Sequence, residues 1–179
     1  MDFPRTKPKV LGYDPQQVDV LFARLQRQYE NPSLKLVDSS VVNVAKFDLV
    51  PGGYQIPAID SALAKLVEIF LEREIAGQVK SGKRDKVAKE LASNLKEIKS
   101  VLENGPKKVF SIEKQGFRKR DVIALVRRIE IKRGALSAPD SLELRTMGFR
   151  RSRSGFDRAE VDAFLNLVIR SQHCQKALS

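Results

Sequence analysis

Tryptophan is absent from the 179 residues, and phenylalanine and tyrosine make up only 7% of the chain, which argues against a large aromatic ligand pocket. Cys174 is the single cysteine, so no intrachain disulfide is expected, as suits a reducing cytoplasm. His173 is the single histidine. Neighbours on a helix point about 100° apart, and no second histidine or cysteine is present to complete a site. We therefore predict no metal and no cofactor.

Long apolar runs are also missing. The densest apolar stretch, 62–75, is interrupted by five charged residues: Lys65, Glu68, Glu72, Arg73 and Glu74. The N-terminus has no apolar segment typical of a secretory signal. We expect neither a signal peptide nor a membrane-spanning helix. The 42% hydrophobic content is enough for one domain or two small ones.

One match to a phosphate-binding loop does not carry the chemistry. Residues 77–83 (GQVKSGK) fit the pattern G-x-x-x-x-G-K, which requires a preceding strand and a following Ser or Thr that holds magnesium. Here a helix is expected before the segment, and Arg84 takes the hydroxyl position. We interpret residues 77–82 as a flexible hinge and a domain boundary. No pair of carboxylates stands out either, so we predict no enzymatic activity.

What the chain does contain is a helix-start motif near its C-terminus, GFDRAEVDAFL at residues 155–165. Asp157 can cap the helix, and Glu160 stands where a capping-box carboxylate reaches back to the cap amide. Val161 then begins an apolar helix face. An equivalent segment, GYDPQQVDVLF, occupies residues 12–22, with Asp14 as the cap and Gln17 at the capping-box position.

Two weaker copies begin at Gly53 and Gly116. All four have a glycine, an aromatic residue, four residues and then Val or Ile, which indicates an internal repeat. A phenylalanine precedes each copy, six residues before the glycine in three copies (Phe47, Phe110, Phe149) and nine before it in the first (Phe3). The motif residues are Gly12, Tyr13, Asp14, Val18, Asp19, Gly53, Tyr54, Ile59, Asp60, Gly116, Phe117, Val122, Gly155, Phe156, Asp157, Val161 and Asp162.

The repeated aspartates and aromatics each have a structural interpretation. Asp19, Asp60 and Asp162 are either solvated carboxylates near a helix N-terminus or groups with a fixed partner on the preceding strand or on another repeat. Ile123 takes this position in the third copy. We interpret the four aromatics as apolar staples between each turn and the helix after it.

This motif resembles the N-terminal motif of DivIVA, a bacterial scaffold that marks poles and septa, and its repetition resembles the DivIVA-domain repeat proteins of actinobacteria. The resemblance implies a cytoplasmic, non-enzymatic protein of cell division or polar growth. It also implies self-association through helices and peripheral contact with the inner membrane surface.

Two features depart from that family. DivIVA inserts a Phe-Arg pair into the membrane just before the Gly-aromatic pair, and none of the matching positions here is Phe-Arg: Val10/Leu11, Pro51/Gly52, Lys114/Gln115 and Arg153/Ser154. The motif helices are also short and interrupted by Pro or Gly, which argues against an extended coiled coil.

Positive charge is concentrated in the last third of the chain. Residues 1–80 hold ten basic and ten acidic residues, whereas residues 105–179 hold 17 and eight, within a net charge of +11. Such an excess favours an anionic partner, namely membrane headgroups, nucleic acid or an acidic protein, although charge runs are often only solvated. The candidate contact residues are Arg145, Arg150, Arg151, Arg153, Lys119 and Arg120.

The elements predicted from periodicity are helices over 14–30, 57–78, 84–103, 118–133 and 157–174. Strands are predicted within 34–50, at 109–112 and near 142–149. The helix over 84–103 has no counterpart between the other copies. The predicted fold is mostly α with short β strands, as four strand-turn-helix repeats in two pairs (1–80 and 105–179) around an inserted connecting helix (81–104).

One repeat of roughly 40 residues cannot bury its own apolar face, so neighbouring copies should pack together. We expect Val18, Leu21, Phe22, Ile59, Leu63 and Leu66 to share one cluster, and Val122, Val126, Val161, Phe164 and Leu165 another. The leading functional prediction is a cytoplasmic scaffold or adaptor, at the pole or septum, that works by protein–protein contact. The alternative is a small basic nucleic-acid-binding protein, although no recognition helix is evident.

Overall fold

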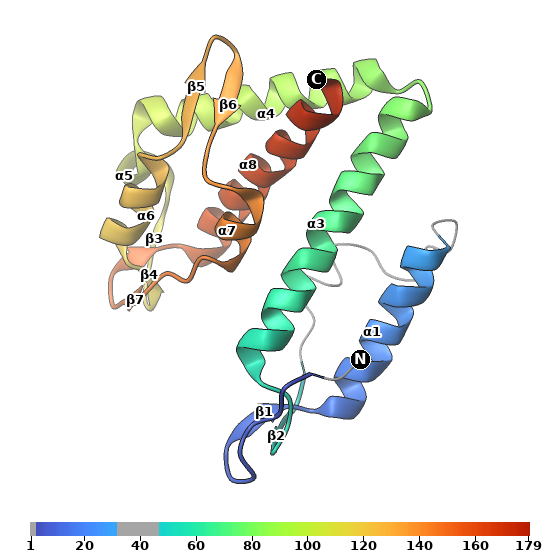
Figure 1. Cartoon of the computed structure of the whole chain (residues 1–179). Coiled ribbons are helices and arrows are strands. Elements are labelled where there is room, and N and C mark those ends of the chain that lie inside the picture. The colour runs from blue at the N-terminus through green and yellow to red at the C-terminus, as the bar shows by residue number, and fades with distance from the viewer. Residues whose placement is uncertain (1–2, 32–46) are drawn as a thin grey trace. The chain divides into compact units, whose positions relative to one another are not determined.

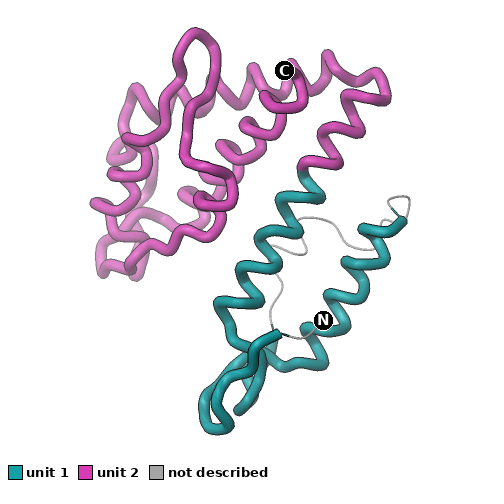
Figure 2. Tube along the Cα trace, viewed as in Figure 1, with its two compact units in different colours: residues 1–71 teal, residues 72–179 magenta. Residues whose placement is uncertain are grey.

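The computed structural model describes residues 3–31 and 47–179, and it is mostly helical with short antiparallel strands (Figure 1). The chain divides into two compact units, unit 1 (Met1–Leu71) and unit 2 (Glu72–Ser179) (Figure 2). The boundary falls inside helix α3 (Ile56–Lys80), ahead of the predicted break at 77–82. Most of the strand predicted within 34–50 lies outside the described residues.

Unit 1 contains strands β1 (Leu11–Tyr13) and β2 (Leu49–Pro51), helix α1 (Pro15–Glu30) and the first part of α3. The helices predicted over 14–30 and 57–78 are confirmed as α1 and α3. The carboxylate of Asp14 caps α1 by accepting a hydrogen bond from the Gln16 amide at 2.8 Å, and Pro15 takes the first helical position, where its missing N–H is not needed.

A single apolar cluster joins α1 to α3. Its buried residues are Val18, Phe22, Leu25, Tyr54, Ile59, Leu63 and Val67, with Phe3, Tyr13, Leu21, Phe47, Ala62, Leu66 and Phe70 packed against them. All six residues predicted to share the first cluster are among these, so that prediction is confirmed. The two helices bury faces that neither could bury alone.

Unit 2 contains a four-stranded antiparallel sheet in the order β3 (Ile112–Glu113), β8 (Gly155–Phe156), β4 (Gly116–Phe117), β7 (Arg151–Ser152). Helix α6 (Lys119–Val126) follows β4, and helix α8 (Arg158–Leu178) follows β8. The Asp157 carboxylate caps α8 by accepting from the Glu160 amide at 2.9 Å. The helix predicted over 157–174 is confirmed. The five residues expected in the second cluster are all buried: Val122, Val126, Val161, Phe164 and Leu165.

Three predicted elements are wrong. The helix predicted over 118–133 ends at Val126, because the chain then forms a hairpin of β5 (Glu130–Lys132) and β6 (Ala135–Ser137). Arg133 and Gly134 turn this hairpin with φ of 52° and 79°, the left-handed conformation that a two-residue hairpin turn requires.

The other two errors are local misreadings of short apolar runs. Residues 106–109 form a single helical turn, α5 (Pro106–Val109), and only Ile112 and Glu113 of that region form a strand. The strand predicted near 142–149 is instead helix α7 (Ser141–Thr146), which the Asp140 carboxylate caps by accepting from the Leu142 amide at 2.9 Å. The cap decides the conformation where the apolar pattern is too short to do so.

Helix α4 (Arg84–Asn104) confirms the helix predicted over 84–103, and it packs along α8 in unit 2. Its buried residues Val87, Ile98 and Val101 face the unit's interior. The β5–β6 hairpin is tied to α8 on another side: the Leu136 amide donates to Gln175 Oε1 at 2.8 Å, and Gln175 Nε2 donates to the Leu136 carbonyl at 3.2 Å. Thus α8 is the element on which the rest of unit 2 assembles.

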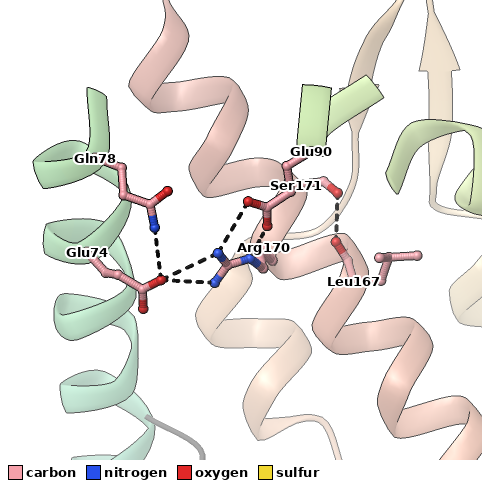
Figure 3. Close-up of polar contacts among 6 residues, drawn as sticks. All are labelled: Glu74, Gln78, Glu90, Leu167, Arg170 and Ser171. Carbon is pink, nitrogen blue, oxygen red and sulfur yellow. Dashed lines mark hydrogen bonds and ion pairs between the residues drawn. The ribbon is translucent and has the colours of Figure 1, made fainter. Parts of the chain in front are cut away.

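Arg170 of α8 lies at the centre of an ion-pair network (Figure 3). Its guanidinium binds the carboxylate of Glu90 on α4 and donates to Glu74 Oε1 on α3 at 3.4–3.5 Å. Gln78 Nε2 donates to the same oxygen of Glu74 at 3.3 Å. The Arg170 side chain is only 33% exposed, and Glu90 raises the guanidinium's pKa further. One arginine therefore holds three helices of unit 2 together.

Replacing Arg170 with glutamine should lower the free energy of unfolding by about 1–3 kcal/mol, because two partly buried carboxylates lose a charged partner. The matched control is Lys99→Gln, which breaks the exposed Lys99–Glu103 pair of α4 and should change stability by less than about 0.5 kcal/mol. Urea unfolding at pH 7 measures both. Equal effects would show that the Arg170 network is no stronger than a surface ion pair.

Candidate functional site

The motif glycines meet in pairs, one pair in each unit. A Cβ placed on Gly12 would lie 2.4 Å from the Tyr54 carbonyl oxygen and 2.8 Å from the carbonyl carbon of Gly53. In unit 2, a Cβ on Gly155 would lie 2.3 Å from the Gly116 carbonyl carbon. These are main-chain atoms that cannot rotate away. The two segments of each pair can approach this closely only because both glycines lack a side chain.

The four segments use the same hydrogen bond across each pair. The residue two positions after each glycine donates its amide to the carbonyl of the residue that follows the phenylalanine of the opposite segment. The four bonds are Asp14 to Asp48 (2.9 Å), Gln55 to Pro4 (2.9 Å), Arg118 to Arg150 (2.7 Å) and Asp157 to Ser111 (2.9 Å). Each segment therefore supplies the start of one helix and the strand that holds the start of the other.

The aromatic residues also make their contacts between opposite segments. Each preceding phenylalanine packs against the motif aromatic of the opposite segment, not against its own. The ring pairs are Phe3–Tyr54 (centroids 5.5 Å apart), Phe47–Tyr13 (5.0 Å), Phe110–Phe156 (5.6 Å) and Phe149–Phe117 (5.0 Å). The aromatics thus serve as staples between segments. The expectation that each one joins a turn to its own following helix omitted this contact.

The repeated aspartates have partners in unit 1. Tyr13 Oη donates to Asp60 Oδ1 at 3.2 Å, and Tyr54 Oη donates to the Asp19 carboxylate at 3.3–3.4 Å. The bonds are reciprocal: each tyrosine reaches the aspartate of the opposite segment. Desolvation raises the pKa of Asp60, and the hydrogen bond from Tyr13 opposes that shift.

Unit 2 lacks these bonds because its aromatics have no hydroxyl. By the same correspondence, Phe117 takes the place opposite Asp162, and Phe156 the place opposite Ile123. Asp162 has no hydrogen-bond or ion-pair partner among residues 3–31 and 47–179. Its side chain is exposed overall, yet neighbouring protein atoms desolvate the carboxylate and raise its pKa, while Arg158 opposes the shift.

The expected capping boxes do not form. Glu160 reaches across to the opposite segment and accepts from the Ser111 amide at 2.6 Å and from Ser111 Oγ at 2.9 Å. Gln17 makes the equivalent contact, donating to Asp48 Oδ2 at 2.7 Å and accepting from the Asp48 amide at 2.9 Å. The reason is that the cap amide already donates to the opposite strand, which leaves it no proton to offer a capping box.

The third copy uses the same position for an ion pair. Asp121 accepts two hydrogen bonds from Arg150, from Nε and Nη2, both at 3.0 Å. This pairing lowers the pKa of Asp121. Arg150, which was predicted as an anion contact, is 71% exposed, and its pair with Asp121 ties the residue before β7 to the start of α6.

The other predicted cations lie in three places. Lys119 and Arg120 form the first turn of α6, and Arg151 lies on β7 beside Phe117 of β4. Arg153 lies in the turn between β7 and β8. Arg145 is half-buried on α7. Unit 2 therefore presents several cations around β4 and β7.

The segment that matches a phosphate-binding loop has no strand before it. Helix α3 continues through Gly77 to Lys80, and the turn consists of Ser81 and Gly82, which has a φ of 80°. His173 and Cys174 are buried on α8, and burial raises the pKa of the Cys174 thiol to about 11, so the thiol stays protonated at neutral pH.

Across the described residues, no group of three or more His, Cys, Asp or Glu side chains could hold a metal ion. Within those residues, no helix has both the length and the apolar character needed to cross a membrane. No protein-family model matches the chain, and neither a curated protein nor a solved structure matches it.

Substituting Gly155 with alanine should destabilise unit 2 by about 3 kcal/mol or more, because the new methyl group would collide with main-chain atoms of Gly116. Gly148→Ala is the control, since its Cβ would meet no atom within 4 Å, and its effect should stay within about 0.5 kcal/mol. Thermal unfolding followed by circular dichroism compares them. A Gly155→Ala protein as stable as the control would refute the close approach.

Phe117→Tyr should place a hydroxyl opposite Asp162 and stabilise unit 2 by about 0.5–1 kcal/mol at pH 7. The folded-state pKa of Asp162 is raised, so its ionisation reduces stability as the pH rises through that pKa, and a donated hydrogen bond should lower the pKa and reduce this loss. Phe156→Tyr is the matched control: it buries a hydroxyl opposite Ile123 and should cost about 1–3 kcal/mol.

An NMR titration of Asp162 and thermal melts below and above its titration midpoint measure these effects. If both tyrosine variants were destabilised alike, Phe117 would not face Asp162.

Proposed function

We propose that this chain is a cytoplasmic scaffold or adaptor of bacterial cell division or polar growth that acts by protein–protein contact at the pole or septum. The sequence resemblance to the DivIVA motif supports the process. The interlocked segments support the mode of action, because they form small rigid platforms held by main-chain contacts. In this proposal the chain is built from four strand-turn-helix repeats in two pairs, with α4 as the additional helix.

The observation that carries the proposal is an exposed apolar tip on unit 1. Val10, Leu11 and Leu49 are 50–52% exposed. The register of β1 and β2 pairs Leu11 with Pro51 and Tyr13 with Leu49, so Leu11, Tyr13, Leu49 and Pro51 lie on one face of this strand pair. The Gly52 amide donates to the Val10 carbonyl at 3.0 Å, which keeps Val10 beside them.

Single exposed apolar residues need no explanation, but a contiguous group held on a rigid strand pair is typical of a protein interface. The apolar tip is small, so it suits a peptide or one edge of a partner rather than an obligate dimer. Unit 1 carries no net charge, with eight basic and eight acidic residues in 1–71, so an apolar contact there would not depend on electrostatic attraction.

The double variant Leu11→Glu/Leu49→Glu tests the proposal in growing bacterial cells of the native host. The tagged wild-type protein should form foci at poles or septa, and the double variant should become diffuse, because two carboxylates at the tip oppose an apolar contact. Val20→Glu is the control: Val20 is 54% exposed but lies on α1, and that variant should keep its foci.

Melting temperatures of the purified proteins should agree within a few degrees, since all three side chains are exposed. A diffuse or nucleoid pattern of the wild-type protein would contradict the proposed function. Wild-type and double variant with equal foci would show that the apolar tip is not the contact.

A further inference from the structure

The second surface of interest is the cationic face of unit 2, around β4, β7 and the start of α6 (Figure 1). We call it the basic face and define it by Lys114, Arg118, Lys119, Arg120, Arg151 and Arg153. The register pairs Gly116 with Ser152 and Phe117 with Arg151. At one end the Arg118 amide donates to the Arg150 carbonyl at 2.7 Å, and at the other end lie the turns that contain Lys114 and Arg153. With about 3.3 Å per residue, these cations fall within roughly 15 Å along the strands. Because side chains alternate along a strand, Arg151 and Arg118 point to opposite sides of the strand pair, so the basic face is this end of the sheet with the cations on both of its sides.

Acidic side chains do not neutralise this face. Asp121 forms an ion pair with Arg150. Glu113 forms one with Arg158, whose Nε donates to Glu113 Oε1 at 3.0 Å. Lys114, Lys119, Arg120, Arg151 and Arg153 have no ion-pair partner among the described residues. All five except Lys119 are exposed.

Three of these cations lie at the N-terminus of α6, where positive charge destabilises the helix. Arg118 is the N-cap residue of α6, and Lys119 and Arg120 begin its first turn. A helix N-terminus carries partial positive charge, so cations there are unfavourable by a few tenths of a kcal/mol each, and this helix has only Asp121 to compensate. An external anion at the basic face would relieve that repulsion.

The shortage of exposed apolar residues near the basic face indicates which class of partner it suits. The exposed large apolar residues of unit 2 are, among those the structure describes, Val109 and Ile112. Ile112 lies on β3, the sheet edge opposite to β7. A protein interface usually has an apolar centre, whereas a nucleic-acid interface is polar and strongly positive. A membrane contact through this face would have no apolar side chain to insert.

The same face has no long helix to carry its arginines to base edges and no free aromatic ring to stack on a base. Phe117 and Phe149 pack against each other as tilted rings and so offer no platform for an unpaired base. Helix α6 has eight residues, and its first turn carries the half-buried Lys119 and the exposed Arg120. Such a surface can contact phosphates but has no means of selecting a sequence.

We propose that the basic face binds the phosphate backbone of duplex nucleic acid without sequence preference. The proposal is independent of the apolar tip, which lies in unit 1. Each cation that contacts a phosphate releases about 0.9 counterions from the duplex. The five unpaired cations therefore predict that the logarithm of the binding constant falls with the logarithm of the salt concentration with a slope near −4.5. Affinity should therefore fall by several hundredfold between 50 and 200 mM salt.

The test is fluorescence anisotropy with two 20-base-pair DNA duplexes of unrelated sequence. The full chain should bind both within about threefold of each other. The triple variant Arg120→Gln/Arg151→Gln/Arg153→Gln should lose about three units of the salt slope, so that the same salt step changes its affinity only about tenfold. Its melting temperature should not fall, because it removes unpaired cations.

Two further triple variants complete the design. Lys86→Gln/Lys89→Gln/Lys96→Gln removes the same net charge from exposed positions of α4 and should change affinity by less than about threefold. Replacing Arg120, Arg151 and Arg153 by lysine keeps the charges and should keep the binding, since a phosphate needs only a point charge.

Three outcomes would overturn the proposal. The first is no duplex binding by the wild-type protein at 50 mM salt. The second is an equal loss of affinity in the α4 control, which would mean that net charge alone acts. The third is that vesicles containing anionic lipid, or an acidic protein, retain the protein at salt concentrations where duplex DNA does not. Localisation of the apolar-tip variants is measured separately, so failure here leaves the scaffold proposal standing.

Discussion

Main-chain atoms of Gly116 and Gly155 lie closer than any side chain would allow, and Gly12 and Gly53 do the same in unit 1. Because the segments lie this close, a carbonyl of each segment accepts a hydrogen bond from the start of the opposite helix. The phenylalanine of each segment also packs against the motif aromatic of the opposite one. Because every buried amide needs a partner, the exchange also removes the capping boxes that each segment could have formed alone. The stability of each strand pair therefore depends on two glycines.

The two units place different chemistry on this shared backbone geometry. In unit 1 the motif aromatics are tyrosines that bind the opposite aspartates, and the strand tip is apolar. In unit 2 the aromatics are phenylalanines, one aspartate position is Ile123, and the strand tip carries Lys114 and Arg153. The whole net charge of +11 resides in unit 2, where residues 72–179 hold 25 basic and 14 acidic side chains. An apolar contact and an ionic contact thus belong to different units.

Unit 2 also contains helix α4, which lies outside the motif segments. Helix α4 packs along α8, and Arg170 connects both to the end of α3 through Glu90 and Glu74. A second addition, the β5–β6 hairpin, is bound to α8 through Gln175. These additions bury the length of α8 beyond the motif, where Ile169 and Cys174 lie.

The sequence alone was enough to locate the long helices, since Asp14, Pro15 and Asp157 are local helix-start signals and the apolar faces of α1, α3, α4 and α8 each span several turns. It was also enough to identify the four motif segments and the concentration of charge. These properties depend on neighbours in the chain. The β5–β6 hairpin, α5 and α7 were missed because each is only a few residues long, so its apolar pattern fits helix and strand equally.

Only the tertiary structure decided which side chains and main-chain groups form hydrogen bonds and ion pairs with one another. Glu160 lies three residues from its helix cap, yet it binds Ser111, 49 positions away, because the cap amide is already bonded across the pair. Arg150 looks free in the sequence but is paired with Asp121, whereas Arg151 next to it is not. Such pairings follow from the approach of segments distant in the chain, and no local pattern of residue types encodes that distance.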